Sequence, residues 1–232
     1  MNFIKNGNAL QRLKLIGLII ILCITTLIYS NHFNNPFFFD DSHTIESNNA
    51  ITSLDNWLRF FTDATTFSSL PANRAYRPMM TLMNAIDYSF AGELDSFYFH
   101  LHIFFWYLIT IILFFVFSNY LYQNTNSYNQ KLVAKVALLS TLFFATHTIN
   151  AETINYICAR SDSFSSLCVL ASLLLFINKK TRKFHLYLFT MIIGIWSKQT
   201  AVMFIPILFS FILLFEHQTH FSRLKKEFKP WV

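Results

Sequence analysis

The chain has 232 residues, of which 54% are hydrophobic and 13% are charged, with a formal net charge of +6. Soluble globular proteins carry about 25% charged residues, so this composition excludes a soluble domain and is typical of a membrane protein. The sequence has four glycines and contains neither a GxGxxG nor a P-loop pattern, which excludes nucleotide-binding sheets of those types.

Apolar stretches along the chain predict about six transmembrane helices, if short or tilted spans are allowed. The basic residues before the first stretch resemble those of a signal peptide, but no small-residue cleavage site follows, which favours an uncleaved anchor. The predicted fold class is therefore all-α, a polytopic membrane protein. Its predicted spans are 13–30, 99–119, 132–147, 164–178, 184–197 and 199–216.

Charged residues divide between the two ends of these spans. If the N-terminal segment 1–12 is cytoplasmic, most of the 18 basic residues lie on the cytoplasmic side, including those of the tail 217–232. All acidic residues except Glu216 and Glu227 then lie on the outer side. This asymmetry follows the positive-inside rule, and attraction to anionic membrane lipids accounts for the positive charge without a nucleic-acid partner.

Within the predicted transmembrane domain 13–216, residues 31–98 form a large first outer loop. Apolar residues at helical spacing over 54–61 predict a helix that lies on the membrane interface. A second interfacial helix is predicted from Pro78, a residue suited to a first helical turn. Its apolar stripe consists of Met79, Leu82, Met83, Ile86 and Phe90, and its opposite face of Arg77, Thr81, Asn84 and Tyr88.

The stretch "FFFDD" places Asp40 and Asp41 directly after Phe37, Phe38 and Phe39. Carboxylates are costly to desolvate, whereas phenylalanine favours a nonpolar medium, so this stretch belongs where the membrane meets water. One interpretation is a solvated turn whose acid caps the following helix. The other is a catalytic base held at the membrane surface.

Further ionisable residues recur at the outer ends of the other spans. Polar groups this close to hydrocarbon are expensive, so they usually pair with one another or serve a site. The structural alternatives are snorkelling side chains and local pairs, such as Arg160 with Asp162 or Glu152. The candidate substrate-binding residues are Arg77, His100, His147, Glu152, Arg160, Asp162 and Lys198.

Several of these motifs occur in a characteristic order: "FFFDD", "YRPMMTLMNAIDYSFAG" leading into "FHLH", "ATHTINAETINYICARSD" and "WSKQTAVMFIPIL". In this order, over about residues 36–206, the chain resembles the N-terminal half of membrane glycosyltransferases of the GT-C type. More narrowly, it is similar to the transmembrane, tetratricopeptide-repeat-containing O-mannosyltransferases and their bacterial relatives. The chain departs from the family pattern at Thr148, Ala159 and Gln199, where Pro, Gly and Glu are usual. It has no 34-residue repeat period, so we expect an N-terminal portion of such a protein.

The resemblance implies a sugar donor linked to polyprenyl phosphate, with mannose as the suggested sugar, and a hydroxyl acceptor on a protein or glycan. Asp40 or Asp41 is the candidate catalytic base, with Asp40 favoured and Asp41 as its helper. Arg77, Arg160 and Lys198 are the candidate cations that stabilise the leaving phosphate. His100 is either structural or a hydrogen-bonding partner of the substrate. The site would face the periplasm from a bacterial inner membrane, or the lumen from the endoplasmic reticulum.

The cofactor is not predicted. A divalent metal such as Mg or Mn is compatible with the chemistry, but no ligand motif supports it, because His147 and Glu152 lack the HExxH spacing. The alternative function is a non-enzymatic membrane protein, such as a transporter, a lipid-flipping subunit or a scaffold, or an inactive truncated relative. Transporters usually carry internal repeats and polar groups near the membrane midplane, whereas these polar groups lie at the outer ends of the spans.

Overall fold

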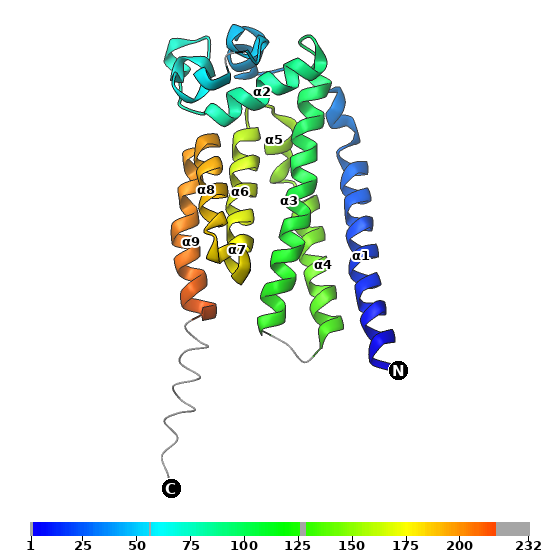
Figure 1. Cartoon of the computed structure of the whole chain (residues 1–232). Coiled ribbons are helices and arrows are strands. Elements are labelled where there is room, and N and C mark those ends of the chain that lie inside the picture. The colour runs from blue at the N-terminus through cyan, green and yellow to red at the C-terminus, as the bar shows by residue number, and fades with distance from the viewer. Residues whose placement is uncertain (1, 56, 126–128, 217–232) are drawn as a thin grey trace.

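The computed structural model describes residues 2–55, 57–125 and 129–216. The described residues form helices and no strands, which confirms the predicted all-α class. The long helices stand side by side as a bundle, and an irregular layer lies across one end of it (Figure 1). The bundle consists of α1 (Asn2–Ile28), α3 (Ser96–Thr125), α4 (Gln130–Thr146), α6 (Arg160–Ile177), α8 (Leu186–Ser197) and α9 (Phe204–Phe211).

Among the described residues, four helical segments are long and apolar enough to cross a membrane. The predicted spans at 132–147 and 184–197 correspond to shorter helices, α4 with 17 residues and α8 with 12. The protein is therefore an all-α, polytopic integral membrane protein. The predicted basic tail lies outside the described residues. The four long segments are Asn8–Ile28, Ser96–Asn124, Arg160–Ile177 and Gln199–Glu216, the last of which comprises η7 (Gln199–Met203), α9 and η8 (Ile212–Glu216).

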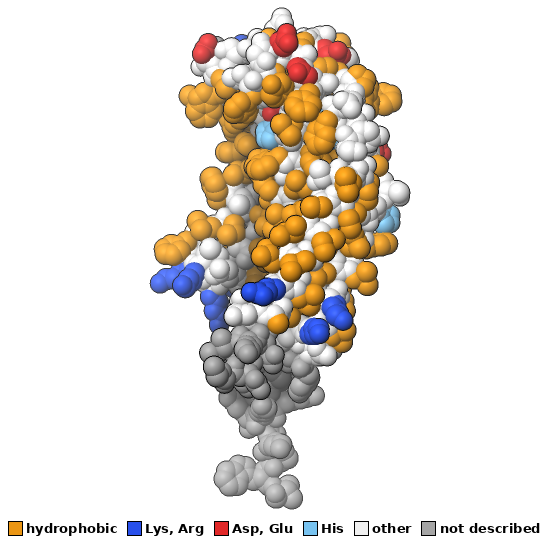
Figure 2. Space-filling model, turned by 90° about the vertical axis from the view of Figure 1, so that its right-hand side faces the viewer, with side chains coloured by type: hydrophobic (Ala, Val, Ile, Leu, Met, Phe, Trp, Pro, Cys, Tyr) orange, Lys and Arg blue, Asp and Glu red, His pale blue; other side chains and the backbone are white. Residues whose placement is uncertain are grey.

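The surface of the bundle has the polarity that a bilayer requires. Figure 2 shows a flank covered by hydrophobic side chains, with acidic side chains at the end that carries the irregular layer and basic side chains at the opposite end. Inside the bundle, α6 and α8 approach closely at Gly194, where a Cβ atom would lie 2.8 Å from the Cβ of Cys168. A larger residue at this position would push the two helices apart.

The irregular layer, which we call the crown, consists of residues 29–95. Where an interfacial helix is predicted over 54–61, the structure has a 3-10 helix over Trp57–Phe61. Trp57 and Leu58 of the predicted apolar face are exposed, whereas Phe60 is buried in the core. The position of this helix on the membrane interface stays a prediction. The other short helices are η1 (Ser30–Asn34), η2 (Ser42–Glu46), η3 (Asn49–Thr52), η5 (Ala64–Phe67) and η6 (Pro71–Asn73).

One long helix of the crown, α2 (Pro78–Ala91), runs across the end of the bundle (Figure 1). It begins at Pro78 as predicted, and it ends at Gly92, whose φ of 75° is a left-handed conformation that glycine adopts without strain. The burial of its side chains does not follow the polarity of the two predicted faces. Asn84, on the predicted polar face, is buried, whereas Phe90, on the predicted apolar stripe, is 78% exposed.

The polar face of α2 is buried because it meets an arginine from the bundle. The guanidinium of Arg160 is completely buried, and it donates hydrogen bonds to the carboxylate of Asp87 and to the side-chain oxygen of Asn84. The ring Nδ1 of His102 contacts the same carboxylate and lies 3.3 Å from Nη1 of Arg160. The predicted pairing of Arg160 with Asp162 or Glu152 is therefore wrong, and this cluster joins α2, α3 and α6.

Breaking the Arg160–Asp87 pair should destabilise the whole fold. Arg160→Ala leaves the Asp87 carboxylate buried without its ion-pair partner, so we expect a loss of about 3–5 kcal/mol in unfolding free energy. Replacing both partners, with Arg160→Met and Asp87→Leu, should cost less than the single change. Thermal unfolding in detergent measures both. The control is Arg59→Ala, because the Arg59–Asp63 pair is exposed, and an equal loss in this control would contradict the prediction.

Candidate functional site

The chain enters the acidic pair through a strained residue. Phe39 has a φ of 53°, in the left-handed region that bulky side chains rarely adopt. Its carbonyl oxygen accepts hydrogen bonds from the backbone N–H of Ser42 at 3.2 Å and from the Ser42 hydroxyl at 2.8 Å. Such strain persists where the surrounding structure enforces it, and it often marks functional sites.

Of the three phenylalanines predicted to enter the interface, one is mostly exposed and meets the rings of Phe38 and Tyr156 only edge-on. The Phe39 side chain is 79% exposed. Phe37 packs edge-on against Phe99 at a centroid distance of 5.4 Å, and Phe38 stacks on Tyr156, also at 5.4 Å. The stretch is therefore fastened to the protein by two rings and presents the third to its surroundings.

Asp41 is completely buried and joins two distant parts of the chain. Its carboxylate accepts hydrogen bonds from the backbone N–H of Cys158 at 2.8 Å and from that of Phe38 at 3.3 Å. Burial raises the pKa of this carboxyl to about 6, although the two N–H donors and the charge of Arg160 act in the opposite direction. Its side chain does not cap the helix that follows it.

Asp40 has the opposite environment, since its side chain is 57% exposed. The backbone N–H of Asp40 donates a hydrogen bond to the hydroxyl of Tyr156 at 3.0 Å, which fixes the residue beside the segment after α5 (Asn150–Asn155). One of its carboxylate oxygens lies 3.3 Å from Nε2 of His43. The carboxylate of Asp40 is therefore accessible from the surface, while its backbone is fixed by hydrogen bonds of its N–H and its carbonyl oxygen.

Among the candidate cations, Arg77 is the one most available to bind an anion. Its guanidinium lies over the ring of Phe67 at 5.2 Å, and its Nε is buried without a hydrogen-bond partner in the described part of the chain. Burial raises the pKa of the Cys158 thiol, the charges of Asp41 and Asp40 raise it further, and Arg77 lowers it. The charges of all three residues therefore act on the same thiol.

Lys198 is already neutralised by an acid. Its Nζ lies 2.5 Å and 2.7 Å from the two carboxylate oxygens of Asp162. Lys198 directly follows α8, and Asp162 is in the first turn of α6, so the pair connects these two helices at the crown end. The two residues predicted to bind substrate separately form one ion pair in the structure.

The remaining candidates are dispersed. His100 is completely buried and packs against the ring of His32 at a centroid distance of 4.4 Å, so the structure places it in the core. Glu152 is exposed on α5. His147 ends α4, where it accepts a hydrogen bond from the N–H of Ile149 at 3.2 Å. Asp40 and Asp41 are adjacent on one turn, Arg77 is close enough for its charge to lower the pKa of Cys158, and His100 and Arg160 lie in the interior.

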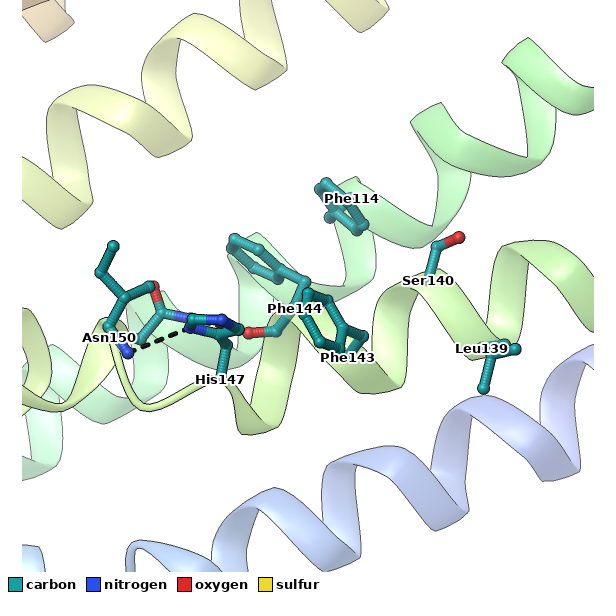
Figure 3. Close-up of a pocket in the computed structure, with 8 residues that line it drawn as sticks. Phe114, Leu139, Ser140, Phe143, Phe144, His147 and Asn150 are labelled. Carbon is teal, nitrogen blue, oxygen red and sulfur yellow. Dashed lines mark hydrogen bonds between the residues drawn. The ribbon is translucent and has the colours of Figure 1, made fainter.

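His147 borders a largely apolar groove between α3 and α4 with a volume of about 730 Å³ (Figure 3). Phe114 from α3 and Phe143 and Phe144 from α4 form its walls, and Asn150 closes the end beside His147. In the part of the chain that the structure describes, no cluster of three or more His, Cys, Asp or Glu side chains could hold a metal ion. No residues are therefore assigned to Mg or Mn.

Sequence reasoning missed several residues that shape this region. Asn84 and Asp87 lie three residues apart on one face of α2, which is a detectable signal for a shared partner. His43 follows Asp40 by three residues within a short helical turn, which brings their side chains together. The role of Cys158 had no such signal, because it contributes a backbone N–H that any residue type except proline supplies.

Comparison with known proteins places these motifs in context. The chain is 29% identical to the mouse protein O-mannosyl-transferase TMTC4 over 159 residues, which cover 65% of this chain and 21% of that protein. It is 29% identical to protein O-mannosyl-transferase tmtc2 of Xenopus laevis over 178 residues, 74% of this chain and 20% of that protein. Human TMTC4 is also 29% identical, over 167 residues. These similarities confirm the resemblance to O-mannosyltransferases, although the chain spans about a fifth of the length of these relatives. No protein-family model and no solved structure matches the chain.

The buried acid predicts a specific pH dependence of stability. Because the Asp41 pKa is raised from 3.8 to about 6 in the fold, the folded state binds more protons than the unfolded state between these values. Stability contributed by Asp41 is therefore present at low pH and is lost as pH rises through about 6. The unfolding free energy of wild type minus that of Asp41→Asn should fall by about 2 kcal/mol from pH 4 to pH 7. Thermal unfolding in detergent across this range measures it, and a flat difference would show that Asp41 is not desolvated.

Proposed function

We propose that this protein is a glycosyltransferase that moves a sugar from a polyprenyl-phosphate donor to a hydroxyl group on a protein or glycan. The observation that carries the proposal is the exposed carboxylate of Asp40 on its fixed turn, next to the buried Asp41. The charge of Arg77 acts on the same thiol, that of Cys158, as the charges of the two acids. The similarity to proteins named protein O-mannosyl-transferase supports it, and favours mannose as the sugar and a protein as the acceptor.

Asp40 has the properties that a general base for this reaction needs. The acceptor hydroxyl gives its proton to the Asp40 carboxylate while its oxygen bonds to the anomeric carbon of the sugar. The bond between that carbon and the donor phosphate breaks, and the phosphate leaves with the electron pair. Asp41 has its carboxylate committed to two backbone N–H groups, so it positions the turn instead of meeting the acceptor.

Arg77 is the proposed partner of the leaving phosphate. Negative charge grows on the phosphate oxygens in the transition state, and a positioned cation stabilises this charge. Its guanidinium is not engaged by a carboxylate among the described residues, and its planar fork suits phosphate oxygens. Lys198 would have to leave Asp162 before it could contribute, so we assign it to joining α6 and α8.

The proposed site lies at the outer face of the membrane. The separation of acidic and basic side chains between the two ends of the bundle supports this orientation through the positive-inside rule (Figure 2). An apolar exterior and a lateral groove offer surfaces that suit the hydrocarbon chain of a lipid-linked donor. The two membranes that fit are a bacterial inner membrane, with a periplasmic site, and the endoplasmic reticulum, with a luminal site.

The first test removes the base. Asp40→Asn keeps the shape of the side chain but removes the proton acceptor, so we expect transfer to fall by about 10²-fold or more without a comparable loss of stability. The assay follows radiolabelled mannose from polyprenyl-phosphate mannose, using the full protein in membranes, with and without chelator. Glu93→Gln, which changes an exposed crown acid, is the control. Undiminished transfer by Asp40→Asn in an active preparation would mean that the base is elsewhere.

The second test compares the two cations. Arg77→Ala should lower the turnover number by about 10²-fold, because charge stabilisation is lost where the phosphate leaves. Arg77→Lys should restore part of it by keeping the charge without the fork. Lys198→Ala should lower protein abundance and transfer in parallel, as expected for a structural pair. The matched control is Arg74→Ala, an exposed arginine three residues earlier. The assignment fails if Arg77→Ala and Arg74→Ala behave alike.

A further inference from the structure

The side chain of His43 lies behind the proposed base and is 9% exposed. Its Nε2 is 3.3 Å from Oδ1 of Asp40, and its Nδ1 is 2.9 Å from the hydroxyl of Ser68. The amide of Asn73 also contacts Nε2, at 2.9 Å. His43 therefore has polar contacts on both ring nitrogens, and these contacts come from different parts of the crown.

The backbone of His43 is fastened to the same segment as its ring. Its carbonyl oxygen accepts hydrogen bonds from the backbone N–H of Ser69 at 3.0 Å and from the Ser69 hydroxyl at 3.2 Å. Ser68 and Ser69 therefore hold both the ring and the main chain of His43. The segment 68–73 leads within four residues to Arg77, the proposed phosphate-binding cation.

The charge of Asp40 decides which ring nitrogen carries the proton. An ionised carboxylate can only accept, so Nε2 of His43 must donate to Asp40. In a neutral imidazole Nδ1 is then an acceptor, which the Ser68 hydroxyl satisfies. The Ser68 oxygen in turn accepts the backbone N–H of Leu70 at 3.1 Å. This tautomer satisfies the contacts of His43 with Asp40 and Ser68. The amide nitrogen of Asn73 is a second donor directed at Nε2 and competes with this tautomer, and the Leu70 carbonyl competes for the proton of the Ser68 hydroxyl.

We propose that His43 is the positioning residue of Asp40, an inference that rests on the proposed function. By holding Oδ1, His43 restricts the rotation of the exposed carboxylate and leaves its open side to the acceptor hydroxyl. By its attachment to residues 68–73, it couples the base to the segment that carries Arg77. The imidazole of His43 therefore fixes the position of Asp40 relative to the segment that carries Arg77. Transfer between two bound substrates requires such fixed positions.

The activity test uses three variants in the full protein, assayed in membranes with polyprenyl-phosphate mannose. His43→Ala should lower the turnover number by about 10-fold to 100-fold with little change in KM, because the base is present but not aligned. His43→Gln keeps an N–H near the position of Nε2, so it should recover most of the rate. Asn73→Ala removes the competing contact on Nε2 and should stay near the wild-type rate.

The control is His185→Asn, because His185 is exposed in the turn at the opposite end of the bundle and its φ of 54° suits asparagine. A purely structural role predicts a different pattern. Equal losses in His43→Ala and Asn73→Ala that follow the unfolding temperature would overturn the inference, as would a failure of His43→Gln to recover any rate.

A second measurement does not depend on transfer. In protein labelled with ¹⁵N-histidine, the Nε2 resonance of His43, identified by its loss in His43→Gln, should shift in Asp40→Ala and stay unchanged in Glu93→Gln. Transfer by the wild type without this shift overturns the inference and leaves the proposed function intact. If the resonance shifts but the wild-type protein transfers no sugar, the contact between His43 and Asp40 exists, but the proposed function is wrong. The role of His43 in catalysis is then wrong as well.

Discussion

The crown depends on one ion pair at the end of the bundle. Burying a guanidinium is costly unless its hydrogen bonds are replaced, and Asp87 and Asn84 of α2 provide the replacements for Arg160. This requirement fixes α2 across the ends of α3 and α6. It also fixes the start of α6, and the residues just before that start hold the candidate site.

The connection from this pair to the proposed base is short. Cys158 lies two residues before Arg160, and its backbone N–H binds the buried carboxylate of Asp41. Tyr156, two residues earlier, accepts the N–H of Asp40 and stacks on Phe38. Adjacent acids therefore have different tasks for a physical reason. Asp41 is anchored to a segment that the ion pair immobilises, and Asp40 is held beside it with its carboxylate outside.

The sequence predicted the features that depend on local pattern. Apolar length located the membrane helices, and Pro78 marked the start of α2, because both signals act within a few residues. The orientation of α2 could not be predicted in this way. The sequence pattern of a polar helix face is the same whether the face meets water or a buried arginine. Here the arginine, Arg160, is 76 residues away from Asn84 in the chain. The helix expected over 54–61 is a shorter 3-10 helix for a related reason, since the spacing of eight residues does not reveal that the ring of Phe60 is buried in the core.

The candidate site shows the same division. Acids beside aromatic residues drew attention to Asp40 and Asp41, but their different burial comes from contacts with residues 156–158, more than a hundred positions away. The pairing of Lys198 with Asp162 likewise depends on the packing of α8 against α6. Composition and spacing identify which residues are costly to place near a membrane, and tertiary structure decides which of them remain available for chemistry.

The exposed ring of Phe39 has a consequence for the geometry of any reaction at this turn. In the proposed orientation the Phe39 ring lies at the membrane surface, where exposed apolar side chains such as phenylalanine enter the boundary between headgroups and acyl chains. The Cα atom of Asp40 lies about 3.8 Å from the Cα atom of Phe39. Under the proposed orientation, the Phe39 ring sets the height of the Asp40 carboxylate above the hydrocarbon. Under the proposed function, an acceptor has to descend to a plane that the bilayer defines, which suits an extended polypeptide segment better than the surface of a folded domain.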